Sequence, residues 1–105
     1  MNRFGGFGGG NMQAMMRQAQ KLQQDALKAK EELDNSSFEG SASGGLVKVV
    51  LKGDFSLNNV KIEHSVVDAD DLEMLEYYIV AAFNDAKAKV ESEKSSKLGA
   101  FGGLI

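Results

Sequence analysis

The sequence has 105 residues, no cysteine, and 15 acidic against 12 basic residues, for a net charge of −3. This length suits one small domain whose modest core would benefit from a partner subunit, and the lack of cysteine excludes disulfides, thiolate zinc sites and cysteine nucleophiles. No apolar stretch approaches the roughly 20 residues that span a bilayer, so we expect a soluble protein of the cytoplasm.

The first ten residues, MNRFGGFGGG, are rich in glycine and precede a helical pattern. Glycine-rich loops before a helix can bind phosphate through backbone N–H groups and the helix dipole. A P-loop also needs a preceding strand and a closing GK[ST], and a dinucleotide site needs a strand before it and an acidic residue after its helix. The sequence provides neither context, so we expect residues 1–10 to form a flexible tail.

Residues 11–35 lack glycine and proline and repeat apolar side chains at spacings of three and four, which predicts an amphipathic helix. Asn11 is the expected N-cap, and the polar run at residues 34–37 is expected to end the helix. The alanines in the apolar stripe favour close packing against another helix or a sheet. The stripe comprises Met12, Met15, Ala19, Leu22, Ala26, Ala29 and Leu33.

In the middle of the chain the period changes to two, and β-branched residues replace helix formers. Val47, Val49 and Leu51 share one face of the middle run, and Lys48 and Lys52 point to the other. The pair Gly44-Gly45 predicts a two-residue hairpin turn. We expect a three-stranded antiparallel meander, with strands at residues 38–43, 46–52 and 57–63.

A second helix is expected to begin in the acidic run at residues 70–73. Asp70 is the expected N-cap and Glu73 its capping-box partner, and both acids suit the positive end of the helix dipole. The helix should end near Ser95, before a second flexible, glycine-rich tail at residues 96–105. Its expected buried face comprises Leu72, Leu75, Ile79, Phe83, Ala86 and Val90.

The sequence therefore predicts a single α+β domain over residues 11–95. Its elements follow the order helix, three antiparallel strands, helix (αβββα), and we expect both helices to pack on the sheet. Charge is uneven along this domain: residues 1–24 contain no acidic residue, whereas residues 54–85 hold eight acidic residues and one lysine. A polyanion responds to charge within about 8–10 Å at physiological salt, so basic regions matter more than the net charge.

No residue pattern marks a catalytic or metal site. His64 is the single histidine, and it lacks the companion ligands that zinc requires. The acidic residues at 68–76 do not follow the spacing of an EF-hand loop, and helix capping explains several of them. We expect no enzyme activity, no cofactor and no small-molecule substrate.

Several runs resemble the YbaB/EbfC family of bacterial nucleoid-associated proteins. They are MRQAQKLQ (residues 16–23), GLVKVVLKG (45–53), NVKIEHSVVD (59–68) and LEYYIVAAFNDAKAKV (75–90). The resemblance implies a homodimer with protruding, tweezers-like helices that binds double-stranded DNA in the nucleoid with little sequence preference. The longer glycine-rich start and the C-terminal tail depart from the family pattern.

The helix lysines and arginine are the expected DNA contacts. Arg17, Lys21 and Lys28 share a face of the first helix away from its apolar stripe, and Lys87 and Lys94 share a face of the second. An ordinary solvated helix surface is the alternative interpretation of these charges. A protein-interaction module, with the alanine- and methionine-rich stripe as its docking face, is the alternative function. The candidate DNA-binding residues are Arg17, Lys21, Lys28, Lys87, Lys89 and Lys94.

Overall fold

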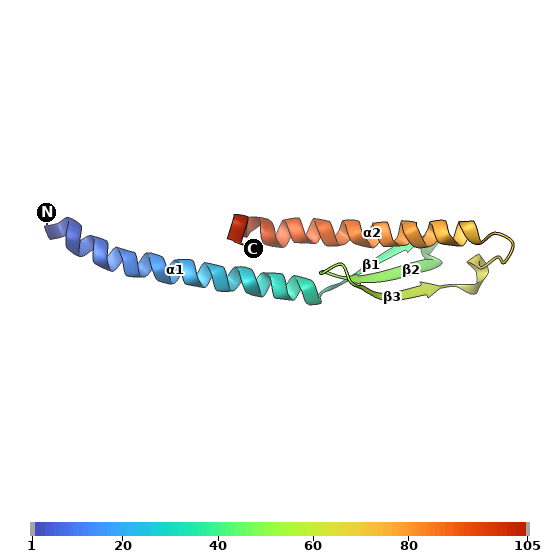
Figure 1. The fold of residues 1–105 in the computed structure, drawn as a ribbon, viewed down its shortest axis with the longest axis horizontal. Helices are drawn as coiled ribbons and strands as arrows, with labels where there is room; N and C mark the ends of the chain where they lie inside the picture. Colours follow the sequence, from blue (N-terminus) through green and yellow to red (C-terminus); the bar gives the residue numbers. More distant parts are fainter. Residues whose placement is uncertain (1, 105) are drawn as a thin grey trace.

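The computed structural model describes the backbone of residues 2–104 and the side chains of residues 11–102. It has the predicted α+β order of helix, three strands and helix (Figure 1). Helices α1 and α2 span Asn2–Asn35 and Leu72–Leu98, and strands β1, β2 and β3 span Ser37–Ala42, Val47–Lys52 and Leu57–Ile62. The strands form one antiparallel sheet in the order β1-β2-β3, which confirms the predicted meander.

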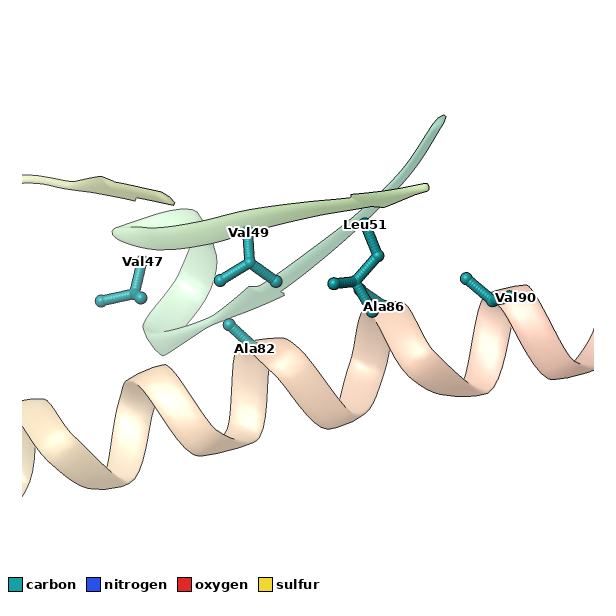
Figure 2. Close-up of a cluster of buried hydrophobic side chains, with 6 residues drawn as sticks. All are labelled: Val47, Val49, Leu51, Ala82, Ala86 and Val90. Atoms are coloured by element: carbon teal, nitrogen blue, oxygen red, sulfur yellow. The ribbon is translucent and has the colours of Figure 1, made fainter. Parts of the chain in front are cut away.

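The hydrophobic core lies between α2 and one face of the sheet (Figure 2). The predicted inward face of β2 is confirmed, because its three apolar residues are buried against Ala82, Ala86 and Val90 of α2. The predicted face of α2 was wrong at Leu72, whose side chain is 52% exposed, and it omitted Ala82. Leu72 starts α2 beyond the region where the helix packs on β1 and β2, which explains its exposure.

Two glycines allow the elements to approach at backbone distance. A Cβ atom at Gly40 in β1 would overlap the backbone of α2 at Ala82 and Ala86. A Cβ atom at Gly53, just after β2, would overlap the carbonyl group of Leu33 in α1. Both positions therefore require glycine for space. The glycines allow β1 to lie close against α2 and the end of α1 to lie close against the sheet.

Helix α1 packs mainly on α2, so the prediction that both helices pack on the sheet was wrong. The two helices run antiparallel, and α1 projects beyond the C-terminal end of the chain (Figure 1). Ala26 and Leu33 of its stripe are buried, whereas Met12 and Met15 are 66% and 58% exposed. The stripe continues past the point where α2 can cover it.

The helix ends differ from the predictions at three of the four positions. Helix α1 begins at Asn2 rather than Asn11, and it ends in the predicted polar run. The side chains of residues 1–10 lie outside the described residues, so the flexibility of this tail stays a prediction. Helix α2 begins at Leu72, after Asp71, and continues to Leu98 rather than Ser95, followed by a 3-10 helix at Gly99–Leu104.

The loop between β1 and β2 is longer than the predicted two-residue turn. Ala42 and Val47 form the last strand pair, and Ser43, Gly44 and Gly45 all have positive φ angles. The amide of Leu46 donates a hydrogen bond to the carbonyl oxygen of Ser43 at 3.3 Å, which closes the loop. The glycines are therefore needed here, but within a wider turn.

The N-cap of α2 is Asp71 rather than Asp70. Its carboxylate accepts a hydrogen bond from the backbone amide of Met74 at 3.2 Å. Asp70 lies in the preceding turn, because its amide donates to the carboxylate of Asp68 at 2.9 Å. Met74 occupies the position that a capping box fills with Glu or Gln, so the predicted role of Glu73 in a capping box was also wrong.

Candidate nucleic-acid interface

Helix α1 presents a basic face away from α2. Arg17, Lys21 and Lys28 are all exposed, and the helical period puts them on the side opposite the buried Ala26 and Leu33. This agrees with the spacing argument made from the sequence. The three cations are free to meet a ligand without any change in the packing between α1 and α2.

Lys89 of α2 contacts the edge of the sheet. Its ammonium group donates to the backbone carbonyl oxygen of Glu39 in β1 at 2.8 Å and lies 3.6 Å from the carboxylate of Asp85. Asp85 in turn accepts a hydrogen bond from the amide of Ser41 at 3.0 Å. Two side chains of α2 thus satisfy backbone groups on the outer edge of β1, where no other strand of the described residues pairs.

Lys94 lies on the other flank of α2. Its ammonium nitrogen is 5.9 Å from the centroid of the Phe55 ring, in the turn between β2 and β3. The same two side chains line a cleft with Lys30 and Asp34 of α1, which form an ion pair at 2.9 Å. Lys87 is exposed nearer the start of α2. The six predicted contacts therefore do not form one continuous surface within a chain.

The lysines of the sheet were not among the predicted DNA contacts. Lys48 of β2 and Lys61 of β3 are directly opposite each other in the strand register, on the face that α2 does not cover. The alternation of residues predicted the face of each lysine. It could not predict that they are partners, since the register depends on the length of the turn between the strands.

Beside α2, an apolar part of the sheet is left uncovered. Val60 and Ile62 of β3 pair with the buried Val49 and Val47, so they share the face of the sheet that meets α2. They are nevertheless 39% and 36% exposed, because α2 packs over β1 and β2. We call Leu57, Val60 and Ile62 the β3 apolar surface.

The turn after β2 contains a carboxylate whose pKa is shifted. Hydrogen bonds from the hydroxyl and the amide of Ser56 lower the pKa of Asp54 below its ordinary value.

In the part of the chain that the structure describes, no three acidic, histidine or cysteine side chains gather as metal ligands. Within the same residues, no helix has the length and apolar character needed to cross a membrane.

The fold matches a known structure. It resembles the crystal structure of an uncharacterized protein from Helicobacter pylori with a TM-score of 0.57, over 87% of this chain and 95% of that one. The two sequences are 23% identical, so this likeness concerns the fold alone.

Relatives of known name are more similar in sequence. A nucleoid-associated protein of Mycobacterium tuberculosis is 46% identical over 97 residues, which cover 92% of this chain and 73% of the relative. A nucleoid-associated protein of Ruminiclostridium cellulolyticum is 43% identical over 104 residues, which cover 95% and 90%. The model of the YbaB/EbfC DNA-binding family matches residues 8–104. With nearly the whole chain matched, the protein belongs to the YbaB/EbfC DNA-binding family.

Proposed function

We propose that this protein is a non-enzymatic, nucleoid-associated protein that binds double-stranded DNA with little sequence preference. Its place would be the nucleoid of a bacterial cell, where coating of the duplex affects nucleoid organisation and gene expression. Membership of a DNA-binding family and the names of the relatives support this function.

The basic face of α1 is the observation that carries the proposal. Its exposed cations lie on the side of α1 away from the packed Ala26 and Leu33, so binding costs no internal contact. Each phosphate that a Lys or Arg neutralises releases condensed counterions, which supplies affinity without reading any base. Lys87 and Lys94 would add contacts along α2, and Lys89 would do so only by leaving the carbonyl oxygen of Glu39.

A homodimer is part of the proposal. The β3 apolar surface is continuous with the core and exposed, and a second copy of the chain would cover it. A dimer also doubles the number of basic helix faces, so that one duplex can meet two of them. The protruding part of α1 then forms the arms of a tweezers-like molecule.

The experiment is a salt series of binding to duplex DNA, with Arg17→Ala and Lys21→Ala compared with the parent. Affinity should fall with salt at a log–log slope of about −0.9 per phosphate contact, and each variant should make the slope shallower. Lys30→Ala is the matched control, because Lys30 lies on the same helix but is paired with Asp34.

Two outcomes oppose the proposal. If the control flattens the slope as much as the two variants do, the contacts do not lie on the basic face of α1. If the parent shows no salt-sensitive binding at all, the protein-interaction module is the better account. That second candidate rests on the exposed methionines of α1, Met12, Met15 and Met16, which suit an adaptable docking face.

A further inference from the structure

The face of the sheet opposite α2 carries lysines and has no helix over it in the described part of the chain. Along β2, the buried residues alternate with Lys48, Val50 and Lys52, which are only partly buried. Lys61 lies on the same face of β3, as the partner of Lys48. The strand alternation thus places Lys48, Lys52 and Lys61 on one face, together with the carboxylate of Glu39, which pairs with Val50.

Lys48 and Lys61 form a cross-strand pair of like charge. Directly opposite residues in antiparallel strands have Cβ atoms about 4.5–5.5 Å apart, and like-charged side chains in such a pair are destabilising. Lys61 has a carboxylate at the limit of an ion pair, with Glu63 at 4.0 Å. Among the described residues, Lys48 forms no ion pair, and its partner on the β1 side is the uncharged Ser41.

The repulsion between the two lysines is therefore only partly offset in the free chain, by Glu63 beside Lys61, and a bound anion would offset the rest. Each ammonium group is a compact charge with three donors, and two of them can share the oxygens of one phosphate. Ser41 and Asn59 lie in the neighbouring strands and offer further polar groups for such a ligand. The acidic residues near this face are Glu39 and Glu63, and neither lies directly opposite Lys48.

We propose that the uncovered face of the sheet, centred on Lys48 and Lys61, binds backbone phosphates of DNA. This site rests on the proposed function, and it lies apart from the helix residues assigned there. DNA would then contact the body of the protein as well as its arms. Because the free pair is strained electrostatically, the same two lysines lower the stability of the free protein and raise its affinity for the duplex.

The test compares the full chain with the double variant Lys48→Gln/Lys61→Gln. Glutamine keeps much of each side-chain stem and removes the charge. The free variant should melt at a higher temperature than the parent. Its salt slope of binding, on a duplex longer than the 84 Å chain, should be shallower by up to about 1.8 per chain, that is, about 0.9 for each lysine.

Lys30→Gln/Lys97→Gln is the control, because it removes the same charge from the helices and leaves the sheet unchanged. A sheet variant that binds with the same slope as this control overturns the inference, and so does a sheet variant that melts lower than the parent. If Lys21→Ala flattens the slope and the sheet variant does not, only this inference fails and the proposed function stands. If inorganic phosphate raises the melting temperature of the parent but not of the sheet variant, while the sheet variant keeps the parent's salt slope on DNA, the site binds free phosphate ions and the assignment to DNA is wrong.

Discussion

Gly40 lies where β1 passes closest to α2. The substitution Gly40→Ala should lower the free energy of unfolding by about 2 kcal/mol or more, because the added methyl group meets backbone atoms that cannot rotate away. Gly99→Ala is the control, since a Cβ atom there meets nothing within 4 Å. Urea unfolding measures the free energy of unfolding of both variants. Equal stability of the two variants would show that β1 can move away from α2 at little cost.

Asp54 should titrate below its ordinary pKa of 3.8, and Ser56→Ala should bring the pKa back toward that value. Since the folded-state pKa is depressed, the stabilisation is present above the unfolded pKa and disappears as pH falls through the folded one. Carboxyl NMR during an acid titration measures the shift. Ser65→Ala, in another turn, should leave the titration of Asp54 unchanged, and a shift in that variant would contradict the local cause.

At the residue scale, the sequence predicted which side chains face the core where the period is regular. The inward face of β2 followed from alternation alone. Ala82 was missed because a small residue on α2 becomes core only where Gly40 lets a strand come close. The contact between Lys89 and Glu39 joins residues far apart in sequence, so spacing along one helix could not reveal it.

Among the elements, the start of α2 gives a direct comparison between two adjacent carboxylates. Asp71→Ala should lower the free energy of unfolding by about 1 kcal/mol, because the Met74 amide loses its acceptor. Asp70→Ala should have a much smaller effect, since Asp71 rather than Asp70 caps the helix. Thermal unfolding at neutral pH measures both. If Asp70→Ala lost more stability than Asp71→Ala, Asp70 would be the N-cap of α2, as the sequence predicted.

The edge of β1 allows a second test at this scale. Asp85→Ala removes the acceptor of the Ser41 amide and the partner of Lys89, so it should cost about 1 kcal/mol and speed hydrogen exchange at Ser41. Glu91→Ala removes an exposed acid from the same helix and should change neither quantity. Unchanged exchange at Ser41 in Asp85→Ala would mean that the edge is protected in another way.

The order and type of the two α-helices and the three strands could be predicted, because α1 and β2 have regular periods and turn or capping residues separate the elements. The ends were less predictable. Two neighbouring aspartates can both cap a helix, and only the turn made by Asp68 selects Asp71. The loop at Ser43–Gly45 is widened by three consecutive positive φ angles, and the glycine pair alone does not determine this width.

For the whole molecule, the β3 apolar surface predicts the oligomeric state. Val60→Lys should convert a dimer into a single chain of 11.3 kDa, because it adds a charge to the surface that a second copy would cover. Asn59→Lys adds the same charge one residue away on the other face of β3, and it should remain dimeric. Light scattering gives both masses. A parent of single-chain mass would remove the homodimer from the proposed function.

At this scale, the sequence predicted the layers only in part. The packing of α1 on α2 rather than on the sheet arises because α2 already fills the apolar face over β1 and β2. The candidate DNA contacts on α1 follow from helical spacing and one packed face. The pairing of Lys48 with Lys61 needs the register between two strands, which the sequence pattern does not fix.

The projection of α1 beyond the rest of the chain also affects how the protein moves in water. The molecule measures 84 × 16 × 16 Å, so it is a thin rod. A rod meets more friction than a sphere of equal mass, and it leaves a gel-filtration column earlier than its mass suggests. A single chain could therefore elute where a compact dimer would, and its slow end-over-end tumbling would broaden its NMR signals. Frictional ratios from sedimentation velocity should reveal this elongation directly.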